Sequence, residues 1–221
     1  MLIVIEGVDG SGKQTHTDKI CTRLLKAGKK VKKIRFPDYE SPSAALVKMY
    51  LAGRFGSRPE DVSAYVASSF YAVDRIASYL SDWKKDYESG KIILADRYTT
   101  SNAVHQACKL EDIERERYLS WLFDYEYNIL KLPKPDLVIF LDMPPHIGLK
   151  LIGNRDNKIT GEAEKDIHER DPKHLEASYN TALEVAREYG WSVVRCSSDN
   201  SVRSIDDISD EIYSLILGLE V

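Results

Sequence analysis

The chain has 221 residues, of which 43% are hydrophobic and 30% are charged, and its net charge is −4. This length allows one sizeable hydrophobic core with a small inserted lid, and the acidic balance does not favour binding to nucleic acids or membrane surfaces. The chain has three cysteines without C-x-x-C spacing, no apolar run of membrane-spanning length, and an apolar strand at its N-terminus in place of a signal peptide. We therefore expect a cytoplasmic protein with reduced thiols.

The first predicted element is a strand at 2–5, which is followed by the loop GVDGSGKQT at 7–15 and then by an amphipathic helix. This order, with the spacing G-x-x-x-x-G-K, is typical of a phosphate-binding loop. The glycines let backbone N–H groups turn toward phosphate oxygens, the helix N-terminus adds a positive dipole end, and the lysine reaches the outer phosphates. The predicted ATP-binding residues of this loop are Gly7, Asp9, Gly10, Ser11, Gly12, Lys13, Gln14 and Thr15.

One position of the loop departs from the usual pattern. Gln14 stands where a serine or threonine hydroxyl normally binds Mg²⁺, and Thr15 comes one residue later. An amide oxygen or a water molecule can replace that hydroxyl. We therefore still expect Mg²⁺ as the cofactor that accompanies ATP, with Thr15 as a candidate metal ligand.

The remaining elements alternate along the chain. Apolar residues at helical spacing predict helices at about 13–27, 44–51, 60–87, 113–130, 146–151, 169–189 and 205–217. Short apolar runs predict strands at 31–36, 92–95, 137–141 and 192–196. The stretch 154–165 is polar and lacks periodicity, which predicts a mobile lid at about 154–167.

Strands that alternate with helices predict an α/β fold, namely a three-layer α/β/α P-loop fold whose five-stranded parallel sheet is covered by helices on both faces. We expect residues 1–221 to form a single domain. Ligands of such sheets bind beyond the carboxyl ends of the strands. Asp9, Asp96 with Arg97, and Asp142 each follow such an end, so we expect a catalytic cluster there.

Four motifs extend this interpretation. They are the loop 7–13 with Asp9 inside it, Arg35-Phe36-Pro37, Asp96-Arg97-Tyr98 followed by Ser101-Asn102, and the run LPKPDLVIFL at 132–141. In this order and spacing the chain resembles the thymidylate kinase family of nucleoside monophosphate kinases over nearly its whole length. The resemblance implies transfer of the γ-phosphoryl group of ATP to dTMP, which gives dTDP, by a homodimeric enzyme.

The resemblance also implies roles for individual residues near the phosphates. Lys13 and Arg97 would be catalytic, with Arg97 beside the transferring phosphoryl group. Asp9 would bind the 3′-hydroxyl of the acceptor sugar and would also be catalytic. Asp96 would orient hydrated Mg²⁺ through water.

Other residues would bind the acceptor nucleotide. Tyr71 would stack on thymine and Arg75, one helical turn later, would donate to a base oxygen; a register error of one residue would assign the stacking to Phe70. Phe36 would lie beside the nucleotide or belong to the core. The implied substrate-binding residues are Asp9, Phe36, Tyr71, Arg75, Arg97, Ser101, Asn102 and His105.

Some positions depart from the family pattern. Tyr39 replaces an arginine that grips the acceptor phosphate, and His105 replaces an aromatic residue that crowds out a ribose 2′-hydroxyl. Gly10 stands where some members have a catalytic arginine, and members without it supply one from the lid, where Arg155 and Lys158 lie. The ATP base is expected near the lid and around residues 198–199.

Two alternatives to a dTMP kinase remain open at this stage. Tyr39 and His105 lie where acceptor contacts are expected, which leaves room for a kinase of another nucleoside monophosphate or of a deoxynucleoside. A GTPase-like switch or a non-catalytic nucleotide-binding module is the second alternative. The sequence has no N-K-x-D segment to read guanine, and it retains Lys13, Asp96 and Arg97, which argues against both forms of this alternative.

Overall fold

The computed structural model describes residues 1–152, 166–168, 170–198 and 201–219. Within these ranges, five strands form one parallel sheet in the order β2-β3-β1-β4-β5. The strands are β1 (Leu2–Glu6), β2 (Val31–Arg35), β3 (Ile92–Asp96), β4 (Leu137–Asp142) and β5 (Ser192–Arg195). The parallel register, with Ile5 opposite Asp96 and Ile139, brings the carboxyl ends of β1, β3 and β4 to one edge.

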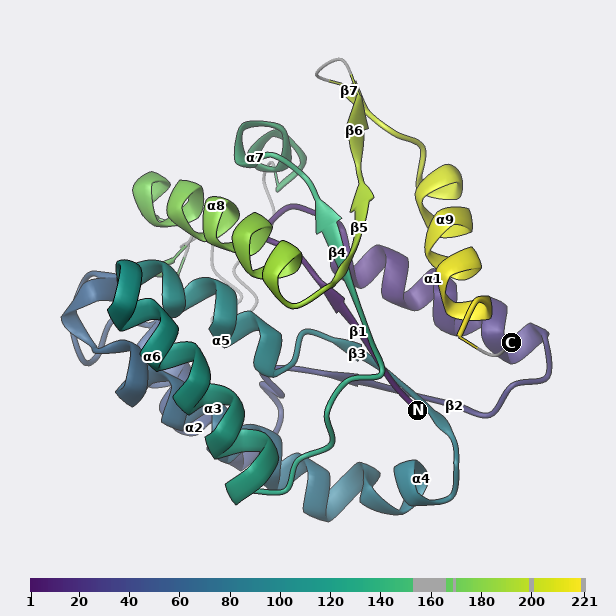
Figure 1. Cartoon of the computed structure of the whole chain (residues 1–221), viewed down its shortest axis with the longest axis horizontal. Coiled ribbons are helices and arrows are strands. Elements are labelled where there is room, and N and C mark those ends of the chain that lie inside the picture. The colour runs from purple at the N-terminus through teal and green to yellow at the C-terminus, as the bar shows by residue number, and fades with distance from the viewer. Residues whose placement is uncertain (153–165, 169, 199–200, 220–221) are drawn as a thin grey trace.

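Helices cover both faces of this sheet, so the predicted α/β/α fold is confirmed (Figure 1). They are α1 (Lys13–Lys26), α2 (Ala45–Leu51), α3 (Ala64–Ser78), α4 (Lys84–Glu88), α5 (Thr99–His105), α6 (Asp112–Phe123), α7 (Pro145–Ile152), α8 (Pro172–Glu188) and α9 (Ile205–Leu217). None of them is long and apolar enough to cross a membrane.

Alternating side chains of β1 divide the core into two layers. Ile3 and Ile5 pack in the cluster that contains residues of α1 and α9, whereas Leu2 and Val4 pack with Trp83 on the opposite face. All four β1 side chains are fully buried, as expected for a central parallel strand covered on both sides. Figure 1 shows α1 and α9 together on one side of the sheet and α5, α6 and α8 on the other.

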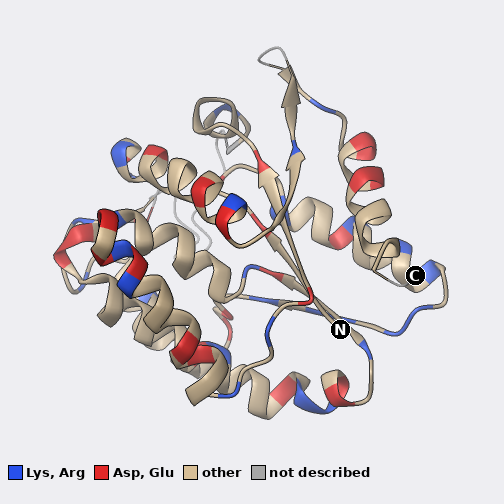
Figure 2. Ribbon diagram, in the orientation of Figure 1, with Lys and Arg blue, Asp and Glu red and all other residues tan. Residues whose placement is uncertain are grey.

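Ion pairs flank the apolar contact between α1 and α9. Acidic residues are concentrated in the first half of α9 (Figure 2), and Lys19 and Arg23 of α1 form ion pairs with Asp206 and Asp210. All four side chains are partly or largely exposed, so each pair contributes only about 0–1 kcal/mol to the free energy of unfolding. The apolar contacts beneath them therefore dominate this packing.

The predicted helix at 60–87 is interrupted. Its main part, α3, begins after Ser63, whose side chain accepts a hydrogen bond from the backbone N–H of Val66. A π-helical turn at Tyr79–Trp83 then separates α3 from α4, and another π-helical turn at Asp124–Ile129 follows α6. Helical periodicity in the sequence does not distinguish such turns from α-helix, because the apolar side chains still face the core.

The helix α5 was not predicted from the sequence. Its residues are TTSNAVH, and threonine, serine, asparagine and valine have modest helix propensity. Nearly every side chain of this helix is buried, so packing against the rest of the protein stabilises it where propensity does not. Since α5 starts three residues after β3, it holds Ser101, Asn102 and His105 close to the edge of the sheet.

Candidate active site

The loop between β1 and α1 has the backbone shape that its glycines predict. Gly10 and Gly12 have positive φ values of 82° and 83°, which glycine adopts without steric cost. The backbone N–H of Ser11 donates to the carbonyl of Val8, and α1 begins at Lys13. The N-terminus of α1 therefore faces the loop, as phosphate binding requires.

The structure explains why position 10 carries no side chain. A Cβ atom at Gly10 would lie 2.5 Å from the backbone oxygen of Gly148 in α7, which is too close for any heavy atom. The Cβ of a Gly148 variant would in turn approach the backbone oxygen of Asp9 at 3.0 Å. An arginine at position 10 does not fit this arrangement, so any cation needed here must come from elsewhere in the chain.

Lys13 is buried with only 8% of its surface exposed, and its Nζ donates to the carbonyl of Val8 at 2.9 Å. Burial and the charge of Arg97 lower its pKa to about 8, although Asp9, Asp96 and Glu6 act in the opposite direction. Below that pH the loop presents a desolvated ammonium group. Such a group interacts strongly with a phosphate anion, because little water screens it.

Arg97 is the centre of the charged cluster. Its Nη2 donates to Asp9 at 2.5 Å, and its Nη1 lies 3.0 Å from Nε2 of His105 and 3.4 Å from Oγ of Ser101. Its φ of 70° is unusual for a residue other than glycine, and such strained conformations are concentrated at functional sites. Arg97 and Lys13 together outweigh the effect of burial and lower the pKa of Asp9 well below its ordinary value.

Glu6 is a site residue that the sequence analysis missed. It is fully buried and accepts hydrogen bonds from the N–H of Gly7 and the hydroxyls of Thr100 and Ser101, while Arg97 lies 3.6 Å away. It therefore ties the start of the phosphate loop to α5 and to the arginine. The feature of the sequence that could have identified Glu6 is an isolated acidic residue at the end of an apolar strand.

The structure distinguishes the two aromatic residues of α3. Phe70 packs on Phe55, with ring centres 5.4 Å apart. Tyr71 packs edge-on against Tyr50, and burial together with neighbouring Tyr50 and Tyr39 raises its pKa well above the ordinary value. The two rings therefore have different neighbours, and base stacking by Tyr71 stays a prediction.

Arg75 is held by a buried partner that the sequence did not reveal. Its Nε donates to Glu126 at 2.7 Å and its Nη2 donates to both Glu126 and Oδ1 of Asn102. Among the residues that the structure describes, Nη1 has only a 3.5 Å contact with the carbonyl of Tyr98. Arg75 is 1% and Glu126 0% exposed. Asn102 also donates to Ser68, so its amide orientation is assigned by this network.

The other predicted residues differ in how close they come to this cluster. Phe36 is 2% exposed and packs on Tyr98, which makes it a core residue. Gln14 and Thr15 are exposed on the first turn of α1. Asp96 is 6% exposed at the end of β3, and its charge acts on both Lys13 and Arg97.

Part of the predicted site lies outside the described residues. This applies to Arg155, Lys158, the stretch 154–165 of the predicted lid, and residue 199. Ile167, at the end of the predicted lid, is 2% exposed, and its N–H donates to the carbonyl of Leu51 in α2. Ser198 belongs to the short strand β6 (Ser197–Ser198), which pairs with β7 (Ser201–Val202).

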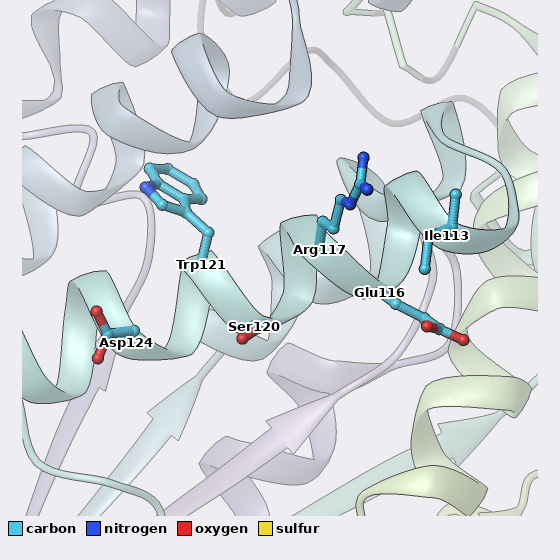
Figure 3. A pocket seen from close by; sticks show the side chains of 6 residues that line it. All are labelled: Ile113, Glu116, Arg117, Ser120, Trp121 and Asp124. Carbon is cyan, nitrogen blue, oxygen red and sulfur yellow. The ribbon is translucent and has the colours of Figure 1, made fainter.

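A hollow of about 510 Å³ on the outside of α6 is separate from this cluster. Figure 3 shows its lining side chains along that helix, and they are Ile113, Glu116, Arg117, Ser120, Trp121 and Asp124. None of them is a predicted site residue. The candidate active site is therefore the cluster at the edge of the sheet, formed by the phosphate loop, the end of β3, α3 and α5.

Behind the phosphate loop, His16 of α1 predicts a measurable acid sensitivity. It is 3% exposed, its Nδ1 lies 3.0 Å from Oγ of Ser209 in α9, and burial followed by the charge of Lys19 lowers its pKa from 6.5 to about 4. Because folding lowers the pKa of His16, its protonation favours the unfolded chain. The contribution of neutral His16 to the free energy of unfolding is therefore complete above the unfolded pKa and is lost as pH falls through the folded pKa. The full loss is about 3 kcal/mol.

We therefore expect Tm to fall between pH 6.5 and 4, and His16→Gln to reduce this fall. The exposed His146→Gln is the control and should leave the profile unchanged. The measurement is thermal unfolding by circular dichroism at several pH values. Identical profiles for wild type and His16→Gln would show that His16 does not carry this effect.

Comparison with known proteins gives consistent matches. The family profile described as thymidylate kinase matches residues 5–210. A thymidylate kinase of Mycobacterium tuberculosis is 30% identical over 194 residues, which cover 86% of this chain and 87% of that protein. A probable thymidylate kinase of Thermococcus onnurineus is 27% identical over 98% of this chain and 97% of its own length, and a thymidylate kinase of Danio rerio is 26% identical over 97% and 92%.

Proposed function

The chain belongs to the thymidylate kinase family, and from that premise we propose that it transfers the γ-phosphoryl group of ATP to dTMP to give dTDP. The observation that carries this proposal is the position of Arg97. Its guanidinium lies between Asp9 of the phosphate loop and the α5 residues Ser101 and His105. A cation at that place contacts a phosphoryl group that moves from a nucleotide on the loop to one beside α5.

The reaction is an in-line displacement in which positioning and electrostatics do nearly all the work. Lys13 holds the outer phosphates of ATP, and its burial strengthens that interaction. Arg97 stabilises the charge that develops on the transferring group, because its planar fork contacts two oxygens at once. Glu6 and Asp9 hold Arg97 in place between the two nucleotides.

Kinases of this family use ATP with Mg²⁺, and the residues present fit such an ion. Asp96 is an acidic side chain at the strand end, and the buried hydroxyl of Ser11 has no hydrogen-bond partner among the described residues. Oxygen donors of this kind suit Mg²⁺, which retains several water ligands. We propose that Asp96 holds the hydrated ion through water, with Thr15 as the lesser candidate. When bound, Mg²⁺ neutralises charge on the phosphates.

The acceptor nucleotide binds on the other side of Arg97. Asp9 accepts a hydrogen bond from the sugar 3′-hydroxyl, Tyr71 stacks on the base, and Arg75 with Asn102 lines the base pocket. Tyr39 packs against the same buried cluster as Tyr71. In this arrangement Arg97 binds the acceptor phosphate, because the uncharged side chain of Tyr39 cannot form an ion pair with it.

A coupled assay of ADP release with each nucleoside monophosphate tests the proposal. We expect ADP release with dTMP in the presence of Mg²⁺ and none in excess chelator, because Asp96 and water complete the metal shell despite Gln14. A requirement for unusually high Mg²⁺ that Gln14→Ser relieves would show that Gln14 weakens metal binding. Equal rates with and without any nucleoside monophosphate, or full activity in chelator, would contradict the proposal.

We also propose the wider organisation that the family resemblance implies. The chain forms one kinase domain with a lid at about 154–167 that supplies Arg155 to the transition state, and it acts as a cytoplasmic homodimer. Exposed apolar residues support a helical interface: Val66, Val73 and Leu80 recur every seven residues and are 48%, 46% and 62% exposed. These side chains lie on one face of α3 and the turn that follows it.

A further inference from the structure

Three buried histidines from distant parts of the chain meet beside the proposed site. His105 ends α5, His168 lies in the described segment 166–168, and His174 is in the first turn of α8. Their exposed fractions are 6%, 6% and 3%. One ring nitrogen from each residue lies within 4.8 Å of the corresponding nitrogens of the other two. Only His105 was expected near the nucleotides, so the cluster as a whole is not explained by phosphoryl transfer.

Two of the six ring nitrogens in this cluster have no hydrogen-bond partner among the described residues. They are Nδ1 of His105 and Nε2 of His174. The opposite nitrogen is engaged in each case: Nε2 of His105 by Arg97 at 3.0 Å, and Nδ1 of His174 by Sγ of Cys108 at 3.7 Å. The great majority of buried polar atoms in proteins have a hydrogen-bond partner. Two such atoms in one cluster therefore indicate a ligand that both can bind.

The spacing of the rings suits one metal ion. When an imidazole nitrogen binds Zn²⁺ at about 2.0–2.1 Å, the ring centre lies about 3.2 Å from the ion, so two rings around a tetrahedral ion are about 5.2 Å apart. The ring centres here are 5.9 Å apart for His105 and His168, 6.2 Å for His105 and His174, and 4.5 Å for His168 and His174. A tetrahedral ion holds two such nitrogens about 3.3 Å apart, so nitrogens that lie within 4.8 Å of one another must approach by up to about 1.5 Å.

We propose that His105, His168 and His174 bind one divalent transition-metal ion of the zinc type. Imidazole ligands suit Zn²⁺, Co²⁺, Ni²⁺ and Cu²⁺, whereas Mg²⁺ prefers oxygen. The site is therefore chemically distinct from the one that holds Mg²⁺ with ATP. Water completes the coordination. Cys108 stays outside, since burial raises the pKa of its thiol to about 11 and its Sγ donates to the carbonyl of His105.

Metal binding at this site is coupled to Arg97. An arginine side chain only donates hydrogen bonds, so Nε2 of His105 must accept from it and Nδ1 must carry the ring proton. If the metal binds Nδ1, the ring proton moves to Nε2, and the N–H groups of His105 and Arg97 then face each other as two donors. If the metal binds Nε2, it displaces Arg97 directly. In both cases the ion removes the hydrogen bond between His105 and Arg97. The positive charge of the ion also repels the guanidinium, so a bound ion inhibits phosphoryl transfer.

The binding test uses the whole chain, purified without metal, with Co²⁺ as a spectroscopic probe and Zn²⁺ in equilibrium dialysis. We expect one ion per chain in wild type and a visible absorption band of four-coordinate Co²⁺. His174→Gln should weaken binding by about 100-fold or more, because even outer-shell partners of metal ligands contribute about 10–100-fold. The control is His146→Gln, since His146 is exposed and outside the cluster.

His168→Gln serves as a second variant, and thermal unfolding without metal shows which variants are folded. Zn²⁺ should raise Tm of the wild type and of His146→Gln but not of the folded cluster variants. This arm does not depend on the reaction, so its failure is distinguishable from failure of the proposed function. Binding that is equally tight in wild type and in the cluster variants, or no stoichiometric binding by wild type, would overturn the proposal and leave a stack of neutral rings.

Activity gives a separate readout of the coupling. With dTMP, ATP and excess Mg²⁺, one equivalent of Zn²⁺ should inhibit wild type and His146→Gln. The activity of His174→Gln without Zn²⁺ should stay close to that of wild type, because His174 contacts neither Arg97 nor the phosphate loop in the structure, and Zn²⁺ should have little effect on it. Equal inhibition of all three proteins would show that Zn²⁺ acts through ATP and would overturn the coupling.

Discussion

Replacement of Lys13 by alanine is expected to lower turnover by about 10²-fold or more, the scale of losing one preorganised transition-state donor. Lys13 is 8% exposed at the start of α1, and its ammonium group is the one cation that the loop itself carries. Because charge develops on the phosphates as the γ-phosphoryl group leaves, the lost interaction is stronger in the transition state than in the ground state. The effect should therefore fall mainly on kcat.

The matched control for this variant is Lys26→Ala, which removes an exposed lysine from the last turn of the same helix. Its turnover should equal that of the wild type. Both variants should keep the wild-type Tm within a few degrees, since Lys13 makes one hydrogen bond to a carbonyl within its own loop. Turnover of Lys13→Ala within a few-fold of wild type would disprove the assignment of this loop.

The second large effect concerns Arg75, whose replacement by alanine should change both stability and base preference. The change leaves Glu126 buried without its partner, and breaking a buried ion pair in this way typically costs about 3–5 kcal/mol of the free energy of unfolding. Within the described part of the chain, the hydroxyl of Thr99, at 2.7 Å, is the hydrogen-bond donor that Glu126 would keep. A large fall in Tm is therefore expected before any effect on catalysis.

Base preference follows from the part of Arg75 that remains available. Glu126 and Asn102 hold Nε and Nη2, so we expect Nη1, with its long 3.5 Å contact, to be the group that turns to a base oxygen. The wild type should prefer dTMP to dUMP by about 10–200-fold, because the two differ by one methyl group. It should reject dCMP by as much as roughly 10⁴-fold, because the cytosine amino group would face a second donor.

The two effects can be separated with a double variant. Arg75→Met combined with Glu126→Gln removes both charges, and neutral replacement of a buried ion pair is often tolerated. We expect Tm to recover relative to Arg75→Ala while the preference for dTMP over dCMP stays lost. The measurements are thermal unfolding and kcat/KM for dTMP, dUMP and dCMP. If wild type phosphorylates dCMP within tenfold of dTMP, Arg75 does not read the base.

Much of this protein is determined by short stretches of its sequence. The phosphate loop was predicted because glycine, lysine and the flanking strand and helix act within about fifteen residues, and local spacing carries that information. The parallel sheet was predicted because each strand is a short apolar run with polar residues at its end. Asp9 and Arg97 follow two such ends, and parallel strands bring their carboxyl ends to one edge.

Only the tertiary structure decided which distant side chains meet. Arg75 and Glu126 are 51 residues apart, and Asp9 and Arg97 are 88 apart. A buried charge needs a partner, but the chain offers many acids, and only packing selects one of them. The helix α5 formed for the same reason, against its own propensity.

The histidine cluster and the packing of Gly10 on Gly148 also could not be predicted from the sequence. No spacing in the sequence links residues 105, 168 and 174, because three separate elements must dock before their rings meet. Likewise, the loop pattern allows an arginine at position 10, and the positive φ of Gly10 together with the approach of α7 excludes it. Backbone conformation follows from neighbours along the chain, whereas these contacts follow from the close packing of elements in space.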